Sequence, residues 1–406
     1  MEVDVAIVGA GPAGLAAAGE LGAERMSVAL IDEYPIPGGR LLGQRYRWKH
    51  RIWDGKHQAE ALVKTVRRFS SVNWLMQHSV YHLERTTTGW TVALNRDDLP
   101  RIFAKAVVVA TGATEVPVAL PNWTLPGVVS VGAAELMWGF YGVAPGKRGI
   151  IVGANPLSFA VAGELKESRA LTSGIVMAPD TPYLDLGGSL DDQWKRIVAL
   201  SGGAAWPIRT LGRLMAQDWL RQCLMGCAPR SGIAIQGTRL RPSVVAVAIE
   251  GSDRVSGIRL RHLPGLGKPR IREWSEPVDF VCIAGGLRPI PDLFRDAEAD
   301  TAWIPELLGE VPIISPWAET SKAGLFAVGN ATGVESALVA MAQGRLGAHG
   351  VVRYLHNQPM DLASSQPERD LIEEARQQSP IAFHPQIRQG LQHLDDLFWK
   401  SRDTPR

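Results

Sequence analysis

The residues with the clearest chemical meaning form a glycine turn near the start of the chain. Gly9-Ala10-Gly11-Pro12-Ala13-Gly14 has the spacing GxGxxG. The first glycine allows a tight turn, the second lets a pyrophosphate approach the backbone, and the third lets a following helix pack closely on the strand. The N-terminus of that helix attracts phosphate groups as well. This spacing predicts a site for a dinucleotide.

The elements around this turn fit the same prediction. The apolar run at residues 3–8 is typical of a buried parallel strand, residues 11–21 are small and apolar like a packed helix, and residues 27–31 form the next strand. Asp32 ends that second strand, where its carboxylate can accept hydrogen bonds from a ribose hydroxyl. Glu33 is the second choice for this role. With all three features present, we interpret the turn as a binding site.

GxGxxG fits FAD and NAD alike, and later segments favour FAD. Pro37-Gly38-Gly39-Arg40 offers a second backbone approach to a pyrophosphate and a cation that can face it. Ala110-Thr111-Gly112 ends another buried strand, and Gly329-Asn330 places a polar side chain beside a glycine at a strand end. A helix around residues 337–347 begins near that point. The full set of residues predicted to hold the cofactor is Gly9, Gly11, Pro12, Ala13, Gly14, Asp32, Glu33, Gly38, Gly39, Arg40, Val80, Ala110, Thr111, Gly112, Gly329, Asn330 and Ala337.

Composition limits the other classes of function. The 43 basic and 41 acidic residues leave a net charge of +2, which gives no electrostatic case for a nucleic-acid partner. No run of about 18 apolar residues exists, so we expect no transmembrane segment. The three cysteines, Cys223, Cys227 and Cys282, form no disulfide framework and fit a reducing compartment. A cytoplasmic protein is therefore expected, with attachment to a membrane through a partner left open.

A chain of 406 residues is too long for one core, and its pattern predicts an α/β fold with two Rossmann-like dinucleotide-binding domains. The expected order is an FAD domain at residues 1–120, a degenerate NAD(P)-type domain at 121–288, the rest of the FAD domain at 289–355, and a helical tail at 356–406. The tail carries Ile387, Leu391, Leu394 and Phe398 at helical spacing. This apolar stripe could cover the chain's own core or a partner.

These motifs resemble the two-domain flavoproteins of the thioredoxin and glutathione reductase group, over residues 1 to about 355. In that group a strand-end Gly-Asp contacts the ribityl chain of the flavin, and the matching residue here is Asn330. A narrower resemblance, to the large FAD subunit of opine oxidases, hydrogen cyanide synthase and dye-linked proline or hydroxyproline dehydrogenases, rests on four segments: Asp32-Glu33, Pro37-Gly38-Gly39, Tyr141-Gly142-Val143-Ala144-Pro145-Gly146-Lys147-Arg148 and Asn155-Pro156-Leu157.

The narrower resemblance implies a heteromer. In that family a second flavoprotein subunit oxidises an amino acid or opine at its C–N bond, and iron–sulfur centres pass the electrons on. Many large subunits of the family end in a cysteine-rich module for a [2Fe–2S] cluster, which needs four thiolates. This chain has no cysteine after Cys282. Either a separate small iron–sulfur subunit supplies the cluster, or the electron route differs.

The sequence also departs from the reductases. Residues 132–138, where thioredoxin reductases carry their redox pair, contain no cysteine, so disulfide reduction through such a pair is excluded. The second glycine turn, at residues 153–158, keeps only Gly153, with Asn155 where a pyrophosphate should approach and Ser158 in place of the third small residue. No acid ends the strand at 174–177 cleanly. We therefore expect no tight NAD(P)H binding.

Several alternatives stay open. The chain could be a stand-alone NAD(P)H-dependent flavin reductase, or a scaffold subunit whose FAD is structural. The degenerate domain could hold ATP or AMP, since Gly153 and a helix N-terminus remain. Cys223 and Cys227 fit buried thiols better than a redox pair or half a metal site, and no metal is predicted. The sequence does not identify catalytic residues. The basic aromatic stretch at residues 45–49, followed by His50, Trp53 and His57, favours a solvated loop over a substrate or subunit channel.

Overall fold

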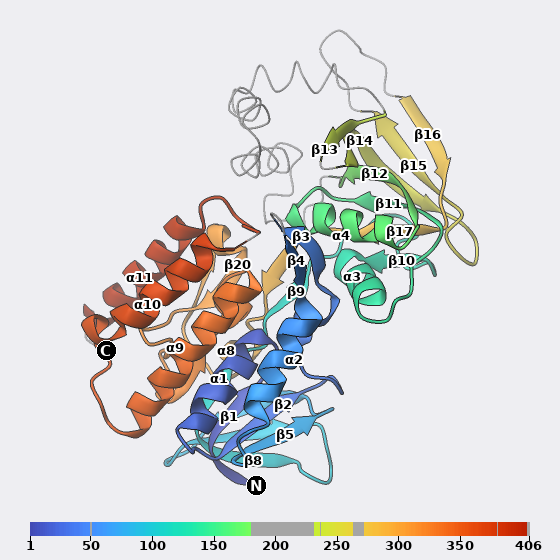
Figure 1. Cartoon of the computed structure of the whole chain (residues 1–406). Helices are drawn as coiled ribbons and strands as arrows, with labels where there is room; N and C mark the ends of the chain where they lie inside the picture. The colour runs from blue at the N-terminus through green and yellow to red at the C-terminus, as the bar shows by residue number, and fades with distance from the viewer. Residues whose placement is uncertain (49–50, 180–230, 236, 263–271, 380, 404–406) are drawn as a thin grey trace. The chain divides into compact units, whose positions relative to one another are not determined.

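The computed structural model describes residues 1–48, 51–179, 231–235, 237–262, 272–379 and 381–403. These residues form two compact units (Figure 1). Unit 1 consists of residues 1–42, 55–114 and 287–406, and unit 2 of residues 43–54 and 115–286. Cys223 and Cys227 lie outside the described residues. Among the described residues, no helix is long and apolar enough to span a bilayer.

The main sheet of unit 1 has the order β5-β2-β1-β8-β7-β6 within the described residues, and β21 pairs with β8. Strands β5, β2, β1, β8 and β21 run parallel, and β7 and β6 continue the sheet antiparallel. The bounds are β1 Glu2–Val8, β2 Val28–Asp32, β5 Val72–Met76, β6 Val80–Arg85, β7 Trp90–Leu94, β8 Arg101–Val109 and β21 Leu325–Ala327. The central parallel strands β1, β2 and β21 and the second half of β8 are apolar runs because both faces of this part of the sheet are buried, whereas the edge strand β5 is partly exposed.

Helices α1 and α9 pack side by side on one face of this sheet (Figure 1). Gly344 of α9 allows the close approach, since a Cβ there would lie 2.2 Å from the Ala13 carbonyl oxygen of α1. The helical segments of unit 1 are α1 Pro12–Ala23, η1 Gly39–Gly43, α2 Gly55–Val66, α8 Asp292–Asp296, η3 Pro305–Leu307, η4 Gly329–Thr332, α9 Ala337–Leu355, α10 Leu362–Gln377 and α11 Ile387–Asp403. Two short strand pairs accompany them: β9 Ala113–Glu115 with β18 Leu287–Pro289, and β19 Thr301–Ile304 with β20 Gly309–Pro312.

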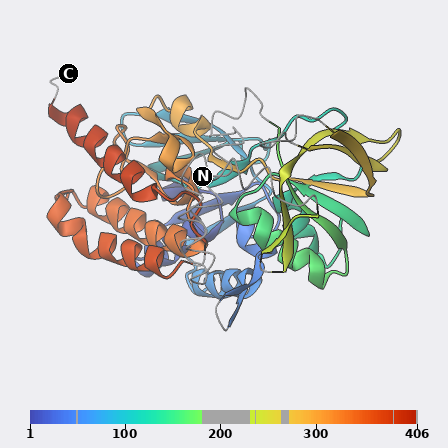
Figure 2. The ribbon, with the colours of Figure 1, turned by 90° about the horizontal axis from the view of Figure 1, so that it is seen from above.

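The C-terminal helices belong to unit 1. The helix α10 lies beside α9, and the orange-to-red end of the chain forms one helical group (Figure 2). On α11, Leu394 is buried against Leu307 and Val311, and Ile387 and Leu391 pack on the same cluster. Of the two interpretations of the apolar stripe, the one in which it covers the chain's own core is therefore confirmed.

Unit 2 contains a sheet with the order β10-β17-β11-β12-β14-β15-β16 within the described residues, and β13 pairs with β14. Strands β10 to β14 along this path run parallel, and β15 and β16 are antiparallel. Its bounds are β10 Val128–Ser130, α3 Val131–Gly139, β11 Arg148–Val152, α4 Pro156–Glu167, β12 Leu171–Met177, β13 Ile233–Ile235, β14 Thr238–Glu250, β15 Gly257–His262, β16 Arg272–Pro277 and β17 Phe280–Ile283. The α/β fold with a strand–turn–helix start in each unit is as predicted.

One local prediction was wrong. The stretch expected as a solvated loop forms two short antiparallel strands, β3 Arg45–Trp48 and β4 Arg51–Asp54. Trp53 on β4 donates from its indole Nε1 to Gln44 Oε1 at 3.2 Å. Aromatic and basic residues alternate here with the two-residue period of a β-strand, and the prediction of a loop considered only the high charge of the stretch. His57 lies in the next element, α2.

Candidate functional site

The first glycine turn has the geometry that its spacing requires. Gly9 adopts φ +106°, and a Cβ there would lie 2.4 Å from the Ala110 carbonyl oxygen. A Cβ at Gly14 would lie 1.8 Å from the Gly9 carbonyl oxygen. At Gly11 the same construction meets no atom within 4 Å. Two of the glycines are thus fixed by the fold itself, whereas Gly11 borders open space, where a ligand could approach the backbone.

Asp32 connects this turn to the end of β2. Its Oδ2 accepts a hydrogen bond from the Ala10 amide at 2.6 Å, and its Oδ1 accepts one from the Tyr34 amide at 2.8 Å. Burial raises the pKa of Asp32 above its usual value, although both backbone hydrogen bonds act in the opposite direction. A carboxylate has about four acceptor positions, so two remain for ribose hydroxyls. Glu33, the second choice, is exposed.

The second glycine pair lies against the first turn. The Gly38 amide donates to the Ala10 carbonyl at 2.8 Å. Gly39 has φ +54°, and a Cβ there would lie 3.1 Å from the Gly11 Cα. The two backbone segments predicted to approach a pyrophosphate are therefore neighbours. Arg40 follows in η1 with a half-buried side chain.

The end of β8 adds a polar side chain to the same edge. The Ala110 amide donates to the Val8 carbonyl at 2.8 Å, which places residues 110–112 beside the glycine turn. Thr111 Oγ1 is buried and has no hydrogen-bond partner within the described part of the chain. Buried hydroxyls are normally paired, so this atom fits a polar ligand at the site. Gly112 has φ +75°, and a Cβ there would meet nothing within 4 Å.

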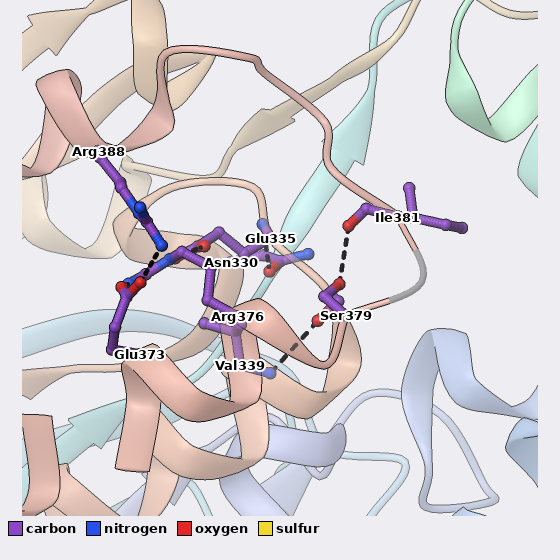
Figure 3. A network of polar contacts seen from close by, with 9 residues as sticks. Asn330, Glu335, Val339, Glu373, Arg376, Ser379, Ile381 and Arg388 are labelled. Atoms are coloured by element: carbon purple, nitrogen blue, oxygen red, sulfur yellow. Dashed lines mark hydrogen bonds and ion pairs between the residues drawn. The ribbon is translucent and has the colours of Figure 1, made fainter. Parts of the chain in front are cut away.

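Gly329 and Asn330 reach the site from far along the chain. The Val328 amide donates to the Val109 carbonyl at 3.1 Å, so β21 ends beside β8. Gly329 has φ +69°, and a Cβ there would lie 2.7 Å from the Ala13 Cβ. Asn330 Oδ1 accepts from the Glu335 amide at 3.1 Å (Figure 3). Ala337 opens α9, which Ser336 caps.

The strands β1, β2, β8 and β21 thus end at one edge of the sheet, as the carboxyl ends of parallel strands do, and almost all the predicted residues lie there. Val80 is less central. It begins β6 after a turn in which the His78 amide donates to the Asp32 carbonyl at 3.0 Å. The backbone approaches, the buried carboxylate and the unpaired Thr111 hydroxyl fit a dinucleotide cofactor.

The second glycine turn, in unit 2, is closed by its own side chains. Gly153 keeps the tight conformation, with φ +108°. Asn155 Oδ1 accepts from the Ser158 amide at 3.1 Å, and the Ser158 hydroxyl accepts from the Asn155 amide at 3.3 Å. Asn155 Nδ2 also donates to the Ala284 carbonyl at 2.9 Å. This capping box occupies the Asn155 and Ser158 amides at the start of α4, two of the groups that would otherwise face a phosphate.

Sequence reasoning missed two features of the described residues. Glu135 and Glu164 are buried near each other in unit 2. Arg376 pairs with Glu335 next to the α9 N-cap. Neither pair has a motif, because its members come from different elements. The thiol of Cys282 is buried, which raises its pKa to about 12 and leaves it unreactive. No group of three or more potential metal ligands occurs among the described residues.

Comparison with known proteins agrees with this geometry. The model of the family described as pyridine nucleotide-disulphide oxidoreductase matches residues 3–344. The chain belongs to this family. Members of this family bind FAD, and the chain is an FAD-dependent oxidoreductase, as the glycine turn and the strand-end residues predict.

Among its curated relatives, an opine oxidase subunit of Agrobacterium tumefaciens (strain Ach5) is 28% identical over 85% of this chain and 64% of the relative. The corresponding opine oxidase subunit of Rhizobium meliloti (strain 1021) is 26% identical over 94% of this chain and 80% of that one. The chain therefore spans a little under two thirds of the first of these relatives. The predicted resemblance to opine oxidase large subunits is confirmed.

Solved structures support the fold assignment. L-proline dehydrogenase from P. horikoshii superposes with a TM-score of 0.63 at 19% identity, over 91% of this chain and 59% of that one. Thioredoxin reductase from T. acidophilum superposes with a TM-score of 0.59 at 16% identity, over 88% of this chain and 99% of that one. At these identities the likeness concerns the fold, which is the predicted two-domain type.

Proposed function

We propose that this chain is the FAD-binding subunit of a heteromeric amino-acid or opine dehydrogenase, acting on a substrate of the proline or hydroxyproline kind, and that it passes electrons to an acceptor other than NAD. The observation that carries the proposal is the capping box of Asn155 and Ser158. It closes the place where a family member would hold a pyridine nucleotide. The names of the relatives, above all the two opine oxidase subunits, supply the substrate class.

We assign the cofactor to unit 1. Gly11 and Gly39 would admit the pyrophosphate to the backbone, Asp32 would accept from the ribose, and Thr111 Oγ1 would gain its missing partner. Asn330 would hydrogen-bond the ribityl chain. The other predicted residues, Gly9, Gly14, Gly38, Gly112 and Gly329 among them, would shape the backbone around it. When bound, FAD supplies the capacity to accept and release electrons.

The chemistry divides between the subunits. Conversion of an amine C–N single bond to C=N releases two electrons and two protons. We place this step in a second, amine-oxidising flavoprotein subunit, and the transfer onward in this chain. The candidate next carrier is a small iron–sulfur subunit. No catalytic side chain is assigned here. The three cysteines of this sequence are fewer than the four thiolates of a [2Fe–2S] cluster, so these residues alone do not hold one.

Unit 2 then acts as a scaffold that has kept the nucleotide-domain shape. Gly153 and the helix start are present, but ATP or AMP would have to displace two side chains that cap α4. A sequence with only three cysteines fits a reducing compartment, so we place the protein in the cytoplasm, where contact with a membrane would be made through a partner.

The test is an anaerobic visible spectrum of the purified protein, before and after NADH and then NADPH. We expect a yellow protein that keeps its flavin band with both nucleotides. In the complex with its partner subunit, L-proline, hydroxyproline or an opine should bleach that band. Rapid bleaching by either nucleotide would instead favour the NAD(P)H-dependent reductase, and flavin that no substrate reduces in the complex would favour a scaffold with structural FAD.

A further inference from the structure

The loop between Asn330 and α9 is held from several sides. Gly329 lies against Ala13 at the start of α1, and the Thr332 hydroxyl donates to the Gly329 carbonyl at 2.9 Å. Val334 is fully buried, and the Phe383 side chain from the tail packs on its cluster. Glu335 then donates its amide to Asn330 Oδ1 at 3.1 Å. The position of the Asn330 side chain therefore depends on where Glu335 sits.

Arg376 on α10 fixes the Glu335 carboxylate (Figure 3). Its Nε donates to Glu335 Oε2 at 2.6 Å, and its Nη2 donates to Oε1 at 2.8 Å. Its Nη1 donates to Glu373 Oε2 at 2.6 Å. Glu373 in turn pairs with Arg388 of α11. The planar guanidinium thus links the loop to both C-terminal helices through a two-point contact that a point charge could not reproduce.

Burial makes this contact demanding. Glu335 is 8% exposed and the Arg376 side chain 15% exposed, so both charged groups are largely removed from water and depend on each other. If Arg376 is lost, the Glu335 carboxylate is left buried and uncompensated. The carboxylate must then turn toward water, and this turn moves the backbone that carries the amide bonded to Asn330.

We propose that Arg376 is a positioning residue for the flavin: through Glu335 it holds the loop that presents Asn330 and the start of α9 to the cofactor. The C-terminal helices are then part of the frame of the FAD site. The inference rests on the assignment of FAD to Gly329 and Asn330 made above. It does not depend on which substrate reduces the flavin.

The experiment measures FAD affinity of the apoprotein by flavin fluorescence quenching, with Arg376→Met and Arg376→Lys in the full chain. We expect Arg376→Met to raise the Kd for FAD by roughly tenfold or more. Loss of a residue that orients a ligand-binding side chain has an effect of this size in metal sites. Arg376→Lys keeps the charge but loses the two-point contact with Glu335, so its Kd for FAD should lie between those of the wild type and Arg376→Met. The visible circular dichroism of the bound flavin should change in Arg376→Met, because the ring environment shifts.

Arg369→Met is the matched control. Arg369 also lies on α10, but its ion pair is with Asp395 of α11, at 2.6 Å, and not with Glu335. Its FAD Kd should stay within about twofold of the wild type. The double variant Glu335→Gln with Arg376→Met removes the stranded charge and should recover part of the affinity. If Arg376→Met fails to fold, the comparison of Arg376→Lys with Arg369→Met decides.

An unchanged Kd in Arg376→Met and Arg376→Lys would overturn the proposal, and so would equal increases in those variants and in Arg369→Met, because the tail would then act only through general stability. A wild-type apoprotein that does not bind FAD would overturn this inference together with the cofactor assignment. If FAD affinity responds as expected while no amino acid reduces the flavin in the complex, the proposed function alone fails.

Discussion

Glu164 on α4 is buried beside Glu135 on α3, and each residue is only 3% exposed. The Arg45 amide donates to Glu164 Oε1 at 3.1 Å. Burial, and then the charge of Glu135, raise the pKa of Glu164 to about 9. Two buried carboxylates this close repel each other when both are ionised, so the folded protein keeps a proton on this pair at neutral pH.

This pair predicts a fall in stability as the pH rises. The folded pKa of Glu164 lies above its ordinary value of 4.5, so the folded state binds the proton more tightly than the unfolded state does. Its stabilising contribution is complete below that ordinary value and is lost up to about pH 9. Across this window the slope should approach about 1.4 kcal/mol per pH unit. Glu164→Gln should flatten it and raise the urea midpoint at pH 8.

Glu167→Gln serves as the control for this prediction. Glu167 lies on the same helix but is exposed, and its charge raises the pKa of Glu164 less than burial and Glu135 do, so its neutralisation should change the slope much less than Glu164→Gln does. A wild-type stability that is flat with pH over this range, or a Glu164→Gln protein less stable than the wild type at pH 8, would contradict the assignment of the buried proton.

His349 predicts a smaller dependence in unit 1. It lies on α9 between Glu20 and Glu368, with Nδ1 2.8 Å from Glu368 Oε1. The carboxylates of Glu20, whose Oε2 lies 3.8 Å from Nε2, and of Glu368 raise the pKa of His349. The stability that the charged ring adds is complete below its ordinary pKa of 6.5 and fades as the pH rises through the raised value. His349→Gln should therefore destabilise the protein more at pH 6 than at pH 9.

The size of this effect is limited by solvent. The His349 side chain is 38% exposed, so the difference between the two pH values should stay below about 1 kcal/mol. Guanidinium unfolding of the variant at both pH values measures it, and His393→Gln, at an exposed position of α11, is the control. Equal destabilisation at both pH values would mean that His349 contributes packing and not charge.

The fold could be predicted because its signals are local. Gly9 and Gly153 each follow an apolar strand and precede a helix, and both adopt the positive φ that their turns require. The pairing of these strands follows from the right-handed crossover that joins parallel strands. The partial exception is residues 45–54, where a row of basic residues hides a strand pair.

The contacts that complete the site could not be predicted in the same way. Glu335 and Arg376 are 41 positions apart, on a loop and on a helix whose packing depends on the whole unit. Asn330 is predicted from the glycine beside it, but its bond to the Glu335 amide follows from a turn with no distinctive spacing. The spacing N-x-x-S of Asn155 and Ser158 fits a helix cap. The same two residues also stand where a dinucleotide-binding glycine motif would have small residues, so the sequence allows both interpretations.

That capping role predicts a cost for Asn155→Ala. The substitution leaves the Ser158 amide and the Ala284 carbonyl without their partner, and it should destabilise the protein by about 1 kcal/mol. Thermal unfolding measures the loss of stability, and Asn155→Gly should cost only a few tenths of a kcal/mol, roughly, because glycine is tolerated at the N-cap. If Asn155 binds a nucleotide instead, the Asn155→Ala change should leave stability unaltered and abolish a response to NADH that the wild type shows.

The glycine turn predicts a separation between folding and cofactor binding. Gly11 has φ −76°, and its Cβ direction is open, so Gly11→Ala should fold with an apoprotein stability within about 0.5 kcal/mol of the wild type. A methyl group there blocks the backbone approach of the pyrophosphate, so FAD affinity should fall by a factor of ten or more in equilibrium dialysis, roughly 1.4 kcal/mol.

Gly14→Ala gives the opposite pattern. Its Cβ would lie 1.8 Å from the Gly9 carbonyl oxygen, which is backbone and cannot give way, so α1 must move off the turn. The apoprotein itself should lose stability, by an overpacking cost of about 1–3 kcal/mol or more, and FAD affinity should fall with it. Thermal unfolding of both apoproteins distinguishes the two glycines. A Gly11→Ala protein that keeps wild-type FAD affinity would contradict the assignment of FAD to this turn. Loss of FAD binding with an apoprotein of wild-type stability would support binding of the pyrophosphate at Gly11.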